Sequence, residues 1–140
     1  MAPVFVDTSA IFAAVDGQAA AHEGVREAWD ELAAERATFI TTNYVVVESF
    51  ALLQRRSGLS AAMDFALRLV PLLQVEWVDP QTHEAAMEAT LTAGRRDLSL
   101  VDCVSFVVMR RLGIRQALTV DPHFREQGFE CFPKESEQPA

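Results

Sequence analysis

Short apolar runs alternate along this chain with longer amphipathic segments. Runs rich in Val, Phe, Ile and Leu predict strands at residues 3–7, 38–41, 74–78, 116–120 and 129–132. Between them, apolar residues recur every three or four positions, which predicts helices at residues 8–15, 20–35, 42–56, 59–72, 80–93 and around Asp102. Ser60 is expected to cap the helix that begins near residue 59.

This alternation indicates the fold class. Strands separated by helices pair in parallel and are covered on both faces, so we expect an α/β sheet. The chain has 140 residues, a mass of 15.5 kDa and 50% hydrophobic residues. It therefore fits one domain with a sizeable core. We expect that domain to span residues 1–132, followed by a polar, frayed tail at 133–140.

Two acidic residues stand where predicted strands end. Asp7 closes the apolar run 3–6, and Asp121 closes the run 117–120 and precedes Pro122. Open α/β sheets place ligands at the carboxyl ends of their strands. Both carboxylates are therefore expected at one edge of the sheet.

Two further acids lie in apolar helical segments. The neighbours of Glu48 three and four positions away are all apolar or aromatic, so Glu48 does not belong to a solvated face. Asp102 lies in the segment 98–109, which is apolar almost all round, and an unpaired charge in such a segment is costly unless it binds a metal. Together with Asp7 and Asp121, these residues suggest one assembled metal site.

Helix capping is the competing interpretation of three of these acids. Asp7 precedes a helix, and Asp121 precedes a proline as N-caps often do. Asp102 follows Ser99 by three residues, the spacing of a capping box. Only Glu48 has no capping explanation.

The charged residues and the cysteines indicate which ligands and which cellular compartment to expect. The net charge is −8, yet eleven of the twelve basic residues are arginine, and Arg95 and Arg96 lie just upstream of Asp102 in a loop that contains glycine. These two arginines are candidates to bind a phosphate backbone. The two cysteines have no metal-type spacing and there is no secretory signal, so we expect reduced thiols in a cytoplasmic protein. No apolar run is long enough to span a membrane, and the spacing of the three histidines does not favour a zinc site.

At this point four segments carry a resemblance to a known family. They are Val6-Asp7-Thr8-Ser9-Ala10, Asn43-Tyr44-Val45-Val46-Val47-Glu48-Ser49, the stretch from Asp97 to Phe106 around Asp102, and Leu118-Thr119-Val120-Asp121-Pro122-His123-Phe124. In this order and spacing they resemble the four motifs of PIN-domain ribonucleases, and more closely the VapC-type toxins of bacterial toxin–antitoxin pairs. The resemblance spans Pro3 to about Phe132.

The resemblance implies a three-layer α/β/α sandwich around a mainly parallel five-stranded sheet, commonly a homodimer. It also implies cleavage of RNA that depends on Mg²⁺ or Mn²⁺, and a cognate antitoxin. Hard cations prefer oxygen ligands, which fits a site made of carboxylates.

On this hypothesis Asp7 and Asp102 bind a cation directly, while Asp121 and Glu48 hold metal-bound waters or a second ion. Thr8 and Ser9 are supporting candidates, although helix capping explains them equally well. Asp97 is an extra acid whose interpretation as a loop or helix-entry residue is favoured.

Three other functions compete with this hypothesis. A phosphatase of the haloacid dehalogenase kind needs a second aspartate where Ser9 stands and a lysine, and the only lysine is Lys134 in the tail. A non-catalytic PIN module that binds RNA or a protein is disfavoured by the four intact acids. A housekeeping RNA-processing nuclease without an antitoxin keeps the same chemistry and stays open.

Overall fold

The computed structural model describes residues 2–134 and contains one five-stranded sheet, in which all pairs are parallel. The strands are β1 (Pro3–Val6), β2 (Thr38–Thr42), β3 (Gln74–Glu76), β4 (Gln116–Leu118) and β5 (Glu130–Phe132). Their order is β3-β2-β1-β4-β5, and in the centre Phe5 is in register with Ile40 and Ala117. The expected tail, 133–140, lies outside the described residues from position 135 onward.

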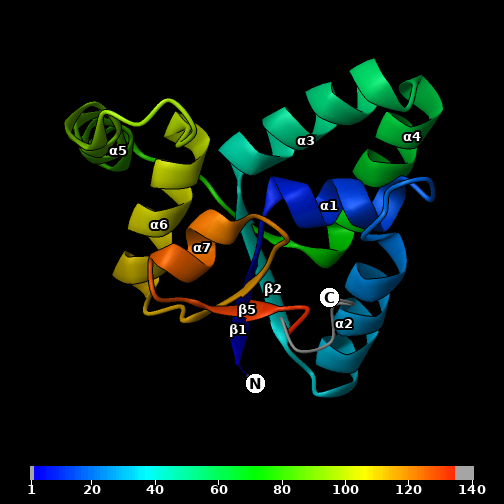
Figure 1. The fold of residues 1–140 in the computed structure, drawn as a ribbon. Coiled ribbons are helices and arrows are strands. Elements are labelled where there is room, and N and C mark those ends of the chain that lie inside the picture. Colours follow the sequence, from blue (N-terminus) through cyan, green and yellow to red (C-terminus); the bar gives the residue numbers. More distant parts are fainter. Residues whose placement is uncertain (1, 135–140) are drawn as a thin grey trace.

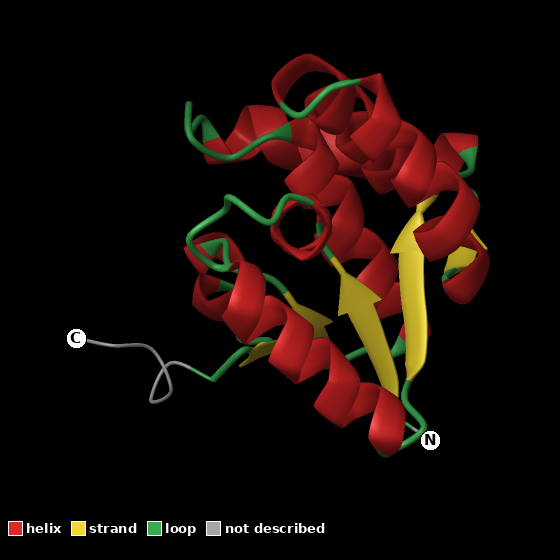
Figure 2. Ribbon diagram, turned by 90° about the vertical axis from the view of Figure 1, so that its right-hand side faces the viewer, coloured by secondary structure: helices red, strands yellow, loops and turns green. Residues whose placement is uncertain are grey.

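The strand order determines how the helices are distributed. From β1 the chain moves outward to β2 and β3, then crosses to the other side for β4 and β5. Since parallel crossovers are right-handed, the reversal places the later helices on the opposite face. One group is α1 (Thr8–Val15), α2 (His22–Ala34), α3 (Asn43–Arg56) and α4 (Leu59–Asp64); the other is α5 (Pro80–Ala93), α6 (Leu100–Leu112) and α7 (Pro122–Glu126). Figures 1 and 2 show the resulting α/β/α layers, which confirm the expected fold class.

The core is centred on β1. Val4, Phe5 and Val6 are completely buried, as expected for a parallel strand covered on both faces. The Phe5 ring stacks on Phe124 of α7 at a centroid distance of 6.3 Å. This contact anchors the short helix that follows Asp121 to the centre of the molecule.

Two local expectations were wrong. The N-cap of α4 is Gly58, with φ of 101°, and Ser60 lies inside the helix without a capping role. Glycine is favoured there because a side chain makes positive φ costly. After α4 the helix widens into a π-helical turn (Phe65–Leu69) and then tightens into a 3₁₀ turn (Val70–Leu72), where Pro71 supplies no amide hydrogen. None of the expected helices lay between residues 120 and 129, yet this segment contains α7.

Two observations bear on the setting of the protein. Cys103 and Cys131 are both buried free thiols. Within residues 2–134, no helix has the length and apolar character needed to cross a membrane.

Candidate active site

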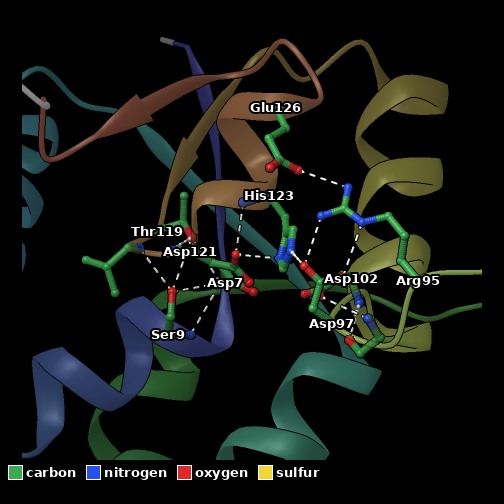
Figure 3. A network of polar contacts seen from close by, with 11 residues as sticks. Asp7, Ser9, Arg95, Asp97, Asp102, Thr119, Asp121, His123 and Glu126 are labelled. Atoms are coloured by element: carbon green, nitrogen blue, oxygen red, sulfur yellow. Dashed lines mark hydrogen bonds and ion pairs between the residues drawn. The ribbon is translucent and has the colours of Figure 1, made fainter. Parts of the chain in front are cut away.

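Asp7 lies directly after β1 and is almost fully buried. It is the N-cap of α1, and one of its two carboxylate oxygens, Oδ2, receives all of its hydrogen bonds from the described residues. The donors are the backbone N–H of Ser9 at 3.3 Å, the Ser9 hydroxyl at 2.8 Å and the Thr119 hydroxyl at 3.0 Å (Figure 3). The other oxygen, Oδ1, is left available.

The hydroxyls of Ser9 and Thr119 join the ends of β1 and β4. Ser9 Oγ accepts from the Val120 N–H and Thr119 Oγ1 from the Asp121 N–H, each at 3.0 Å. Each hydroxyl has one hydrogen, and in both residues it is donated to Asp7. Two short relays therefore run from backbone N–H groups through a hydroxyl to Asp7 Oδ2. Such an oxygen is best satisfied when it carries no proton.

Asp102 reaches the same region from the first turn of α6. It forms a capping box with Ser99: its backbone N–H donates to Ser99 Oγ at 3.0 Å, and its Oδ2 accepts from the Ser99 N–H at 3.2 Å. The side chain is half-buried. As at Asp7, only one of the two carboxylate oxygens accepts a hydrogen bond from residues 2–134.

Asp121 is the N-cap of α7. Its Oδ1 accepts from the His123 N–H at 2.9 Å, and the ring Nδ1 of His123 lies 2.7 Å from the same oxygen. That second approach is short but lacks hydrogen-bond alignment, so we treat it as an electrostatic contact. Asp121 Oδ2 is the oxygen left without a partner in the described part of the chain.

The three acids are electrostatically coupled. Burial is the largest cause of a raised pKa at Asp7; together with the charges of Asp102 and Asp121, and against the hydrogen bonds from Ser9 and Thr119, it brings that pKa to about 6. Burial also raises the pKa of Asp102, and Asp121 adds to the effect. Among residues 2–134, each acid has one oxygen anchored by hydrogen bonds and one oxygen without a partner, and burial makes negative charge unfavourable in this site.

This arrangement fits a divalent cation. Carboxylate oxygens are the ligands that Mg²⁺ and Mn²⁺ prefer. Asp102, Asp121 and His123 each offer a ligand atom, and these atoms lie within 4.8 Å of one another. Of the residues described, Asp7 lies outside that group but close enough for its charge to interact with both acids.

Capping and site formation are not alternatives in this structure. Asp7 and Asp121 both cap helices, and Asp102 belongs to a capping box. The capping hydrogen bonds orient the carboxylates, which still meet at the carboxyl ends of the paired strands β1 and β4, from where the chain turns to opposite faces of the sheet. Open α/β sheets bind ligands at such a switch point.

Other candidates lie outside this polar network. Glu48 is half-buried on α3 and has no hydrogen bond or ion pair with any of residues 2–134. Thr8 is buried beside Asp7, and its Oγ1 has no hydrogen-bond partner within the same range. The catalytic role of Glu48 and the supporting role of Thr8 stay predictions.

Asp97 and Arg95 form an extension of the site (Figure 3). Arg95 makes a two-point contact with Asp97, and His123 Nε2 lies 3.1 Å from Asp97 Oδ2. These contacts, Arg95 first, hold the pKa of Asp97 well below its usual range, and the same Asp97 contact raises the pKa of His123. Neither His123 nor Thr119 stands out as a site residue in the sequence.

Two hollows of the surface lie away from the acids. One, of about 610 Å³, is bordered by α1, α2 and the segment after α4, with Trp29 and Arg68 in its wall. The other follows the outer face of α5 near Met87 and Leu91. Neither is lined by Asp7, Asp102 or Asp121.

The fold and the acidic switch point define a PIN domain, and the chain belongs to that family: the sequence model of the PIN domain matches residues 4–130. Among its relatives is the 23S rRNA-specific endonuclease VapC20 of Mycobacterium tuberculosis. In strains CDC 1551 / Oshkosh and ATCC 25618 / H37Rv it is 36% identical over 127 residues, which cover 90% of this chain and 95% of the relative.

A solved structure agrees with the sequence comparison. The crystal structure of Mycobacterium tuberculosis VapC20, a sarcin-ricin loop cleaving toxin, has a TM-score of 0.81 and 35% identity, again with coverage of 90% and 95%. The resemblance noted in the sequence to PIN-domain proteins of the VapC type is thereby confirmed.

Proposed function

We propose that this protein is a metal-dependent endoribonuclease and the toxin of a toxin–antitoxin pair. The observation that carries the proposal is the convergence of Asp7, Asp102 and Asp121, each with one anchored and one free oxygen, at the switch point of the sheet. RNA as substrate is supported by the name of VapC20, a 23S rRNA-specific endonuclease.

The free oxygens of Asp7, Asp102 and Asp121 would hold Mg²⁺ or Mn²⁺, with Glu48 as a fourth acid on α3. Bound divalent cations supply activation of water and neutralisation of charge on the phosphate. The protein itself orients the carboxylates: Ser9 and Thr119 restrict Asp7 to one direction, and burial makes its unpaired charge unfavourable. Both effects favour a cation over an empty anionic site.

We propose the sarcin-ricin loop of 23S rRNA as the first substrate to test, since the chain aligns with 95% of the relative that cleaves it. The cytoplasm is the corresponding compartment, and the free thiols of Cys103 and Cys131 are consistent with it. The antitoxin is proposed to present basic residues to the acidic site by charge-assisted hydrogen bonds.

The protein is further proposed to form a homodimer. Several apolar side chains remain in solvent in the single chain, among them Val47 at 68% exposure and Leu67 at 69%. They lie in the helical segments Tyr44 to Leu53 and Phe65 to Leu72, whose apolar faces are larger than one small sheet requires. A twofold interface would remove such side chains from water.

The deciding experiment incubates purified protein with 23S rRNA and Mg²⁺ or Mn²⁺ and maps the new RNA ends. We expect a specific cut with wild type and none with Asp7→Asn or Asp102→Asn, because the amide preserves shape while removing ligand charge. Wild-type cleavage by either variant refutes the site assignment. RNA binding without cleavage by wild type would identify a non-catalytic module instead.

A further inference from the structure

A series of contacting ionisable side chains runs from the surface to the acidic site. Glu126 Oε2 accepts from Arg95 Nη1 at 3.2 Å, and Arg95 donates to both oxygens of Asp97, from Nε at 3.2 Å and from Nη2 at 2.9 Å. Asp97 Oδ2 then contacts His123 Nε2 at 3.1 Å, and His123 Nδ1 reaches Asp121 Oδ1 at 2.7 Å. The side chains of Asp97 and His123 are 61% and 12% exposed, so the series leads inward.

We propose that Asp97 is a positioning residue that sets the placement of Asp121 through His123, with Arg95 as its clamp. The proposal deepens the function proposed above and rests on it. It assigns a role to an acid that the sequence left without one, and it gives Arg95 a role other than binding RNA.

Asp97 is unsuited to bind a cation directly. Both of its carboxylate oxygens already accept hydrogen bonds from Arg95, and Oδ2 also contacts the His123 ring. Within the described chain, it is also absent from the group of ligand atoms formed by Asp102, Asp121 and His123. Its influence on the site must therefore pass through the imidazole.

This series of side-chain contacts connects two separate parts of the fold that each supply an acid to the site. Asp97 lies in the loop before α6, which carries Asp102, whereas His123 and Glu126 belong to α7, which follows Asp121. A helix of five residues has little stability of its own, so tertiary contacts must fix its orientation. The contacts at both ends of α7 hold Asp121 at a set distance from Asp102.

The same contacts distinguish the roles of two neighbouring arginines, Arg95 and Arg96. All three guanidinium nitrogens of Arg95 are engaged by Asp97 and Glu126. Arg96 is exposed and has no hydrogen bond or ion pair with residues 2–134. Arg96 is thus the better candidate to contact a phosphate, and it serves as a matched control for Arg95.

The test measures the Mn²⁺ dissociation constant of the full-length protein without RNA, by calorimetry, and then kcat and KM for RNA cleavage. Removing the partner that orients a metal-site imidazole typically weakens metal binding about 10- to 100-fold, and we expect this loss for Asp97→Asn. Arg95→Gln should weaken Mn²⁺ binding in the same direction and lower kcat, with KM for RNA unchanged. Arg96→Gln should leave the Mn²⁺ constant unchanged, and Arg95→Lys, which keeps one charged donor, should recover part of the loss.

Contrary results have distinct meanings. Wild-type Mn²⁺ affinity in Asp97→Asn overturns the proposal, as does an Arg95→Gln variant whose only change is a raised KM for RNA. Melting temperatures of all variants are recorded, and an equal loss of Mn²⁺ affinity in Arg96→Gln would indicate general destabilisation and also overturn it. If wild type binds Mn²⁺ but cleaves no RNA, the proposed function fails, while the Mn²⁺ constants still decide the role of Asp97.

Discussion

Replacing Asp7 by asparagine should make the metal-free protein more stable while removing its activity. The carboxylate is almost fully buried, and its neighbours Asp102 and Asp121 are also acidic. The asparagine amide has nearly the same shape, and its oxygen can accept the donors that now reach Oδ2, namely Ser9 and Thr119. The variant therefore keeps the hydrogen bonds and removes the buried charge.

The size of the effect follows from the pKa of Asp7. It rises from 3.8 to about 6 on folding, and one unit corresponds to about 1.36 kcal/mol, so the charged form disfavours folding by about 3 kcal/mol. The folded state binds the proton more tightly, so this group's contribution is fully present below pH 3.8 and is lost as pH rises through about 6. Asparagine mimics the protonated form and avoids that loss. We expect a gain of about 1–3 kcal/mol at pH 7.5, or about 3–10 °C in melting temperature for a chain of this length.

The assay compares wild type and Asp7→Asn by thermal and urea unfolding, with EDTA or Mg²⁺, between pH 4 and pH 8. The stability difference should grow as pH rises and should shrink with Mg²⁺, which stabilises only the protein that binds it. A variant less stable than wild type at pH 7.5 in EDTA would refute the reasoning. So would a gain that does not depend on pH.

Ser99→Ala removes one half of the capping box on α6, so it should lower the free energy of unfolding by about 1 kcal/mol; urea unfolding checks this, and an unchanged midpoint contradicts it. Light scattering at tens of micromolar should report twice 15.5 kDa for wild type and a smaller mass for Val47→Asp, whereas a wild-type monomer refutes the dimer. The product of a neighbouring antitoxin gene should inhibit cleavage, and inhibition that survives replacement of all its basic residues by Ala contradicts the proposed mode.

The sequence was most informative where one residue has two local roles. Asp7 and Asp121 stand at strand ends, and Asp102 stands three residues after Ser99, so chain position alone predicts both their capping and their common edge. The alternation of strands and helices predicts a parallel sheet for the same reason: each crossover is local in sequence. These features need no knowledge of which strands are neighbours.

The residues that sequence analysis missed depend on strand order. Ser9 and Thr119 are 110 positions apart, and they meet only because β4 lies beside β1. His123 was set aside because the histidines have no paired spacing, yet its partners are carboxylates on two separate segments. The Ser60 cap was wrong because Gly58, with positive φ, begins the helix two residues earlier than a polar cap would. Nothing in local periodicity reports such contacts.

The double role of the acids also has an evolutionary consequence. Asp7 and Asp121 are N-caps, and asparagine caps helices as well as aspartate does. Codons for these two amino acids differ by a single base. Loss of either charge is thus one point mutation away, by a route that leaves the helix capped and the fold intact. Under selection against the nuclease, we expect alleles that encode a folded but inactive protein to arise readily. Such a protein would still bind its partners.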